Sequence, residues 1–281
     1  MPQLITSDHC SVQYFDQGQG PTLIFLHGWS SSAMEWLPFA ERLSDRYRVI
    51  CWSARGHGLQ THAADTDVSL DRMSQDLHQL LQQQAPDGAV LIGHSMGALT
   101  AWNYIRQFGC ERLNGLCIVD QSPRLLTGSD WPMGVYGDFC AHRNARFVER
   151  LQRDFPDAVC RLIFSCLDHP EQPLPDAPLV ARLRRYLATL PAELLTRCWQ
   201  SLTAADLRAV LPSIDCPTLL IYGADSQFYS AELARWVQQQ IAGSTLLRYP
   251  GADHSPHIAE RQRFVEDLHR FILPLHQAVP A

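Results

Sequence analysis

Gly93-His94-Ser95-Met96-Gly97 decides the fold of this chain, because the run has the form G-x-S-x-G between a predicted strand and a predicted helix. The apolar residues 89–92 before it have the length and composition of a buried strand, and residues 96–108 after it have helical spacing. A sharp turn between two such elements strains the backbone of its central serine. The flanking glycines leave room for the close packing that this turn needs. The sequence therefore predicts that the Ser95 hydroxyl projects from a strand end, at the N-terminus of a helix that favours developing negative charge.

The alternation of strand and helix extends outward from this turn in both directions. Short apolar runs predict strands at residues 22–26, 47–52, 89–92, 116–119, 218–222 and 245–249. Helical spacing predicts helices at 33–43, 70–83, 96–108, 230–240 and 260–273. This order is typical of an α/β fold with a mostly parallel central sheet and helices on both faces.

The middle of the chain interrupts this pattern. From about residue 123 to about residue 207 the segments are helix-like or broken by proline, without a clear strand. We therefore predict a core made of residues 1–123 and 208–281, with a helical cap inserted at 124–207. The cap is rich in aromatic residues, and we expect three that follow the 116–119 strand to line a mostly apolar pocket: Trp131, Tyr136 and Phe139.

Composition argues against several classes of protein. The 281 residues are 46% hydrophobic and carry a net charge of −6, without a basic cluster of the kind that binds nucleic acid. No apolar stretch has the length of a membrane span. The nine cysteines are odd in number and scattered, which indicates free thiols in a reducing compartment. The first residues lack the pattern of a signal peptide, so we expect a cytoplasmic protein. The sequence does not indicate an oligomeric state.

Two further motifs accompany the G-x-S-x-G run. His27-Gly28-Trp29 resembles an H-G-x oxyanion loop, and residues 55–58 resemble an R-G-x-G turn. With them, the chain resembles the α/β-hydrolase superfamily over nearly its whole length. It is most similar there to bacterial arylesterases and cofactor-free haloperoxidases. Two positions depart from the usual pattern around the R-G-x-G turn, where Ser53 replaces an aspartate and Gln60 a serine.

The resemblance implies an α/β-hydrolase fold and a serine hydrolase with Ser95 as its nucleophile. It places the oxyanion hole at two backbone N–H groups, those of Trp29 and Met96. The Trp29 ring is expected to form part of the wall of the acyl pocket.

Twelve histidines are candidates for the base, and position selects among them. Residues 251–257, between the last predicted strand and the last predicted helix, resemble the superfamily's G-H-x-P-H loop, whose first histidine is catalytic. This correspondence selects His254. It leaves His257 as a structural residue.

The acid has two candidates. The superfamily usually places it in a G-x-x-D loop after the strand at 218–222, but here Ser226 stands at the acid position and Asp225 one residue early. Some members carry the acid after the preceding strand, where this chain has Asp120. We favour Asp120 and keep Asp225 as the alternative.

The predicted activity is hydrolysis of a small to medium, apolar or aromatic carboxylic ester or thioester through an acyl-enzyme on Ser95. No metal or organic cofactor is expected, since the histidines lack metal-ligand spacing and no G-x-G-x-x-G follows the first strand. A second hypothesis is a cofactor-free, ring-cleaving 2,4-dioxygenase of the hydroxyquinolone type, which would use His254 and Asp120. A third is a non-catalytic receptor with the hydrolase fold. The partner in each case is a small molecule.

Overall fold

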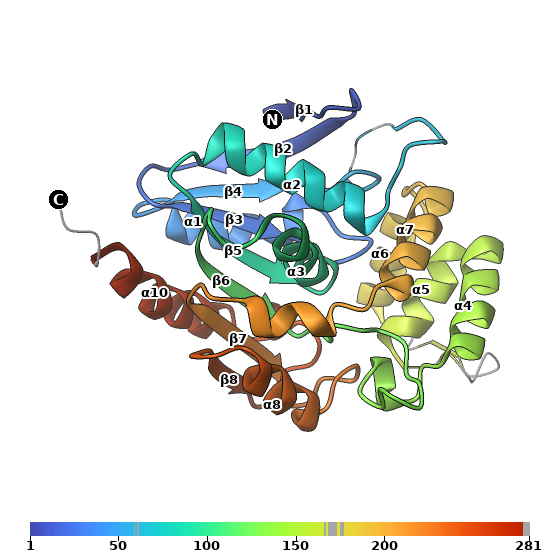
Figure 1. Ribbon diagram of the computed structural model, residues 1–281. Helices are drawn as coiled ribbons and strands as arrows, with labels where there is room; N and C mark the ends of the chain where they lie inside the picture. Colours follow the sequence, from blue (N-terminus) through green and yellow to red (C-terminus); the bar gives the residue numbers. More distant parts are fainter. Residues whose placement is uncertain (59, 61, 166, 168–172, 175–176, 278–281) are drawn as a thin grey trace.

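A single eight-stranded sheet organises the molecule, which is described here from a computed structural model at residues 1–58, 60, 62–165, 167, 173–174 and 177–277 (Figure 1). The strand order is β1-β2-β4-β3-β5-β6-β7-β8, and all neighbours from β4 to β8 pair in parallel. The strands are β1 (Gln3–Ile5), β2 (Ser11–Gln17), β3 (Thr22–Leu26), β4 (Arg48–Trp52), β5 (Ala89–His94), β6 (Leu113–Val119), β7 (Thr218–Gly223) and β8 (Thr245–Tyr249). The predicted α/β class with a mostly parallel sheet is therefore confirmed.

The first two strands are an addition that the sequence pattern did not predict. β1 pairs with β2, and β2 with β4, in antiparallel register. β2 buries Val12 and Tyr14, but these alternate with the polar residues Ser11 and Gln13. This half-buried pattern lacks the continuous apolar run by which the parallel strands were recognised.

The side chains of the central strands alternate between two apolar layers, as the two-residue period of a strand requires. Leu23 and Phe25 of β3 face one layer, which α1 (Leu37–Leu43) and α10 (Arg261–Gln277) cover. Ile24 and Leu26 face the other, which α2 (Leu70–Gln84), α3 (Met96–Phe108) and α8 (Ala231–Gln240) cover. Because both faces are buried, β5 is buried at every position and carries no polar side chain until His94.

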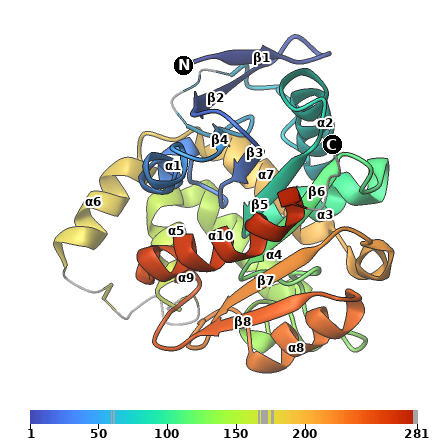
Figure 2. The same ribbon diagram turned by 90° about the vertical axis from the view of Figure 1, so that its left-hand side faces the viewer.

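Helices occupy the predicted insertion, which we call the cap segment (residues 124–207). Its described residues form α4 (Ala141–Arg153), α5 (Phe155–Ile163), α6 (Pro178–Leu187) and α7 (Ala192–Ala204), with isolated β-bridges but no strand. These helices gather beyond the end of the sheet toward which β5 and β6 point (Figures 1 and 2). The predicted domain boundaries themselves stay a prediction. Within the described part of the chain, no helix combines the length and the apolar character that crossing a bilayer requires.

Candidate active site

Ser95 occupies a strained turn between β5 and α3. Its φ of 53° and ψ of −116° lie in a region that side chains rarely adopt. The two motif glycines explain how the turn packs. A Cβ atom on Gly97 would lie 2.1 Å from the Leu26 carbonyl oxygen, and one on Gly93 would lie 2.6 Å from that of Gly97. The turn therefore requires glycine at both positions, and it exposes Ser95 at the carboxyl end of the central strand.

Asp120 and His254 form a buried pair beside this turn. Asp120 follows β6 directly and has a φ of 47°, while His254 lies in the loop after β8. The His254 Nδ1–H group donates to Asp120 Oδ2 at 2.7 Å. The same carboxylate accepts from the Gly223 N–H at 3.0 Å and from the Ser226 hydroxyl at 2.7 Å. Three donors thus hold Asp120 in one orientation toward the imidazole.

Asp225, the alternative acid, lies elsewhere. Its side chain is exposed, and its backbone N–H donates to the Ala252 carbonyl at 3.0 Å. Ser226, at the position where the superfamily usually has its acid, points its hydroxyl at Asp120 instead. The structure therefore brings Asp120, and not Asp225, to His254.

Burial has the largest influence on the pKa of His254. It holds the pKa of the imidazole below its ordinary value of 6.5, although the hydrogen bond to Asp120 favours the charged form. The ring is therefore neutral near pH 7, with its Nδ1 proton on the Asp120 side and a free lone pair on Nε2. Ser95 and His254 line the same cavity, and no hydrogen bond within 3.5 Å joins their side chains among the described contacts. Such contacts are often long in the absence of substrate.

The predicted oxyanion loop lies against the serine. A Cβ atom on Gly28 would lie 3.5 Å from Ser95 Cβ, so the backbone of this loop runs directly beside the Ser95 turn. The Trp29 indole N–H donates to the Leu195 carbonyl in α7 at 2.9 Å, and its ring packs on Trp199 with centroids 4.9 Å apart. Met96, the first residue of α3, is buried.

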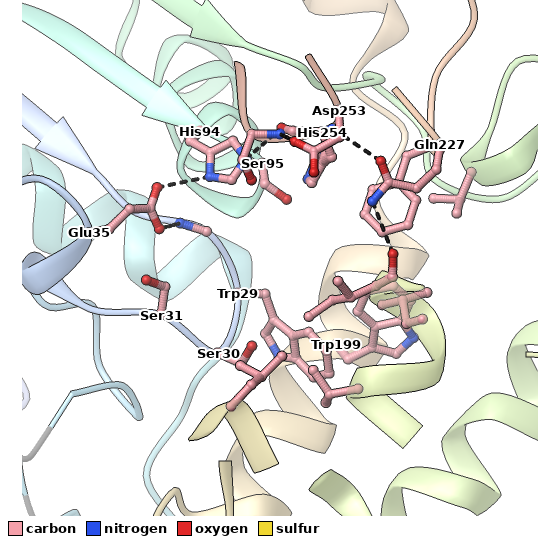
Figure 3. A pocket seen from close by; sticks show the side chains of 18 of the residues that line it. Trp29, Ser30, Ser31, Glu35, His94, Ser95, Trp199, Gln227, Asp253 and His254 are labelled. Carbon is pink, nitrogen blue, oxygen red and sulfur yellow. Dashed lines mark hydrogen bonds and ion pairs between the residues drawn. The ribbon is translucent and has the colours of Figure 1, made fainter. Parts of the chain in front are cut away.

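A cavity of about 270 Å³ opens over Ser95 between the sheet and the cap segment (Figure 3). Apolar side chains from the cap and from the loop after β7 form its apolar side: Leu125, Val135, Val159, Leu162, Ile163, Leu183, Tyr186, Trp199, Phe228 and Tyr229. The predicted apolar pocket is therefore present. Six of these residues come from helices α5 to α7, which are distant from Ser95 in the sequence.

The three aromatic residues chosen from the sequence do not line this cavity as it is described, and that prediction is wrong. Trp131 is buried against Trp236 of α8, with ring centroids 4.7 Å apart. Phe139 is fully buried and packs on Phe147 and Trp199 inside the cap. Tyr136 donates its hydroxyl to the Leu162 carbonyl and faces a separate hollow. Each serves the packing of the cap, because aromatic content alone does not distinguish core residues from pocket residues.

One cluster beneath the cavity was not recognised as a unit in the sequence. Glu35, His94 and His257 place potential ligand atoms within 4.8 Å of one another. Hydrogen bonds already engage Glu35 and His94: the Gly28 N–H donates to Glu35 Oε2 at 3.2 Å, and His94 Nδ1 lies 2.9 Å from Glu35 Oε1. These two residues come from a helical turn after β3 and from the end of β5, so only the fold joins them.

Comparisons with known proteins agree with this architecture. The sequence matches the model of the alpha/beta hydrolase family over residues 23–267. It is 29% identical to the pimeloyl-[acyl-carrier protein] methyl ester esterase of Nitrosomonas europaea, over 91% of this chain and 97% of the relative. It is 28% identical to the enzyme of the same name from Aliivibrio salmonicida, over 94% and 97%.

Solved structures share the fold. An esterase from Exiguobacterium antarcticum superposes with a TM-score of 0.84 at 24% identity, covering 96% of this chain and 98% of the esterase. A bromoperoxidase from Bacillus anthracis superposes with a TM-score of 0.80 at 23% identity, covering 93% and 95%. The superfamily expected from the sequence is thus confirmed: the chain belongs to the alpha/beta hydrolase family.

Proposed function

We propose that the protein hydrolyses a carboxylic ester or thioester through an acyl-enzyme on Ser95, with His254 as the base and Asp120 as the acid. The observation that carries the proposal is the buried hydrogen bond of 2.7 Å between His254 Nδ1 and Asp120 Oδ2, next to the strained serine turn. It gives the imidazole the tautomer that a general base needs. The ester hydrolases among the relatives and neighbours support the same chemistry.

The proposed reaction has two steps. Ser95 Oγ attacks the carbonyl carbon while His254 Nε2 takes its proton, and the Asp120 carboxylate stabilises the imidazolium. The backbone N–H groups of Trp29 and Met96 stabilise the oxyanion. When the ester bond breaks, His254 returns the proton to the departing alcohol or thiol. Water then attacks the acyl-enzyme by the same route and releases the carboxylic acid.

The cavity favours an uncharged, apolar acyl or alcohol group. Its described lining contains no lysine or arginine, and its acidic members are Glu35 and Asp253. Such a wall stabilises apolar groups and disfavours a free carboxylate. The relatives' name refers to a methyl ester of an acyl chain on a carrier protein. We therefore propose methyl esters of medium acyl chains, free or carried on that protein, as the first natural candidates to test.

We also propose the cap segment, residues 124–207, as the lid of this cavity, and the cytoplasm as the compartment. Leu183 and Tyr186 of α6 and Trp199 of α7 supply part of the cavity wall, which supports the first proposal. The described cysteines are free thiols, and several are fully buried, which suits a reducing compartment.

A p-nitrophenyl butyrate assay tests the function, with Ser95→Ala as the inactive variant and Ser213→Ala, at an exposed serine, as its matched control. We expect the wild-type protein and Ser213→Ala to hydrolyse the ester and to be labelled by a fluorophosphonate, and Ser95→Ala to do neither. Because burial lowers the pKa of His254, the acid limb of kcat/KM should have its midpoint below pH 6.5.

The Asp120–His254 pair is also what a cofactor-free dioxygenase would use. The same protein is therefore tested on a 3-hydroxy-4-quinolone with and without oxygen. Oxygen-dependent turnover without esterase activity would overturn the hydrolase proposal. Ligand binding without turnover or labelling would point to a receptor.

A further inference from the structure

Glu35 connects three segments of the proposed active site. Its Oε2 accepts the Gly28 N–H of the oxyanion loop at 3.2 Å, and its Oε1 lies 2.9 Å from His94 Nδ1 in the nucleophile turn. His257 Nε2, from the short helix Pro256–Ala259 that follows His254, lies 3.3 Å from the same oxygen. Only 8% of the Glu35 side chain is exposed, so these contacts form largely without water. Figure 3 shows Glu35 and His94 side by side at the cavity.

Both ring nitrogens of His94 face oxygen acceptors. Nδ1 faces the Glu35 carboxylate, and Nε2 lies 3.0 Å from the backbone carbonyl oxygen of His254. A neutral imidazole carries one N–H and so can donate only one of these bonds. Satisfying both acceptors requires a proton on each nitrogen.

His27 is a buried histidine with the contrasting pattern of hydrogen-bond partners. Its Nδ1 lies 2.7 Å from the Gly28 carbonyl oxygen, while its Nε2 accepts the Ala54 N–H at 3.0 Å. One acceptor and one donor suit a neutral ring. Burial accordingly lowers the pKa of His27. Burial opposes charge on His94 too, but the Glu35 carboxylate, the His254 carbonyl and Asp120 together outweigh it and raise the pKa of His94 above 6.5.

We infer that His94 is a fixed imidazolium, held by Glu35, which positions the His254 loop and keeps His254 neutral and ready to accept a proton. Its Nε2–H group donates to the backbone carbonyl of His254. Its positive charge lies close to the His254 ring, with 4.8 Å between the two ring centroids. Glu35 and His94 are positioning residues, since neither needs to touch the substrate. The inference deepens the proposed function and rests on it.

The charges around His254 determine the direction of the effect. Asp120 and Asp253 favour its protonated form, and His94 opposes it. Glu35 partly offsets the field of His94, and His257, whose pKa burial lowers to about 4, adds no charge near neutrality. Removing the cation of His94 should therefore raise the pKa of His254. Across about 5 Å the shift is roughly 0.6 to 2.4 pH units for an effective dielectric constant between about 80 and 20.

The first test reads the proton of His94 directly and does not depend on activity. Histidine side chains labelled with nitrogen-15 are observed by NMR in the full-length protein, and His94→Gln identifies the His94 signals. At about pH 7.5, where an ordinary histidine is neutral, we expect two N–H signals from His94 in the wild-type protein. In Glu35→Gln we expect one. A single N–H in the wild-type protein would overturn the inference even if esterase activity is present.

The second test measures the acid limb of kcat/KM with p-nitrophenyl butyrate. We expect its midpoint to rise in the order wild type, Glu35→Gln, His94→Gln, because the last variant removes the cation and leaves the Glu35 carboxylate. Glu41→Gln, the same substitution at an exposed position, is the control and should leave the midpoint in place. If both variants had lower rates but the wild-type midpoint, the role of Glu35 and His94 would be merely structural and the inference would be overturned. A wild-type midpoint in Glu35→Gln alone would overturn the role given to Glu35.

The same three side chains are also a possible metal-ligand set, and a third measurement addresses that case. A bound metal would need an unprotonated nitrogen of His94. We expect that adding Zn²⁺ leaves both N–H signals of His94 in place. Their loss on stoichiometric metal binding would overturn the imidazolium. Circular dichroism and thermal melting establish that each variant is folded before it is compared.

Discussion

Replacing Asp120 with asparagine tests the proposed triad most directly. The carboxylate accepts three hydrogen bonds: from the Gly223 N–H on Oδ1, and from Ser226 Oγ and His254 Nδ1 on Oδ2. An amide keeps the bond from Gly223 through its oxygen, but it then directs its NH₂ group at His254. Because a donor now faces Nδ1, the imidazole moves its proton to Nε2 and cannot take one from Ser95.

The expected loss follows from that change of tautomer. A triad histidine held in the wrong tautomer loses about 10⁴-fold in kcat, which is about 5.4 kcal/mol of transition-state stabilisation. Asp225→Asn is the matched control, because its side chain is exposed and is not brought to His254. We expect its kcat to stay within about twofold of the wild-type value.

Steady-state hydrolysis of p-nitrophenyl butyrate measures both variants, and circular dichroism checks that they are folded. If Asp120→Asn kept most of the wild-type kcat while Asp225→Asn lost it, the assignment of the acid would be refuted. If both variants remained active, neither Asp120 nor Asp225 would be the acid, and the proposed triad would be refuted.

Three further predictions follow from the same contacts. In Asp120→Asn, the additional change Ser226→Asp should recover about tenfold or more in kcat, since Ser226 Oγ lies 2.7 Å from Asp120 Oδ2; no recovery would show that position 226 cannot reach the base. Trp29→Phe removes the indole bond to the α7 backbone but keeps the backbone N–H, so KM should rise about fivefold with kcat nearly constant; a dominant loss of kcat would contradict this. His57 and His257 are buried with pKa values lowered from 6.5 to about 3 and about 4. Because the unfolded chain binds protons below pH 6.5 and the folded chain does not, urea unfolding should show a stability loss of roughly 4 kcal/mol between about pH 7 and pH 5; unchanged stability would contradict their neutral burial.

The features that the sequence predicted correctly are those that depend on neighbouring residues. The parallel strands and the turn at Ser95 were predictable, because apolar periodicity and paired glycines report local backbone geometry. β2 was missed because its buried residues alternate with polar ones. Trp131 was misplaced in the pocket, because a buried aromatic ring has the same sequence signal in a core as beside a ligand.

The sequence by itself determined the α/β-hydrolase architecture, the serine turn and the loop that carries His254. Only the tertiary structure brought Asp120 to His254, which lies 134 residues further along the chain, and turned Ser226 toward it. Only the structure showed Glu35 against His94, 59 residues apart. The physical reason is that strand and turn preferences act between neighbouring residues. A hydrogen bond between distant side chains depends instead on sheet register and loop direction, which the whole packed molecule determines.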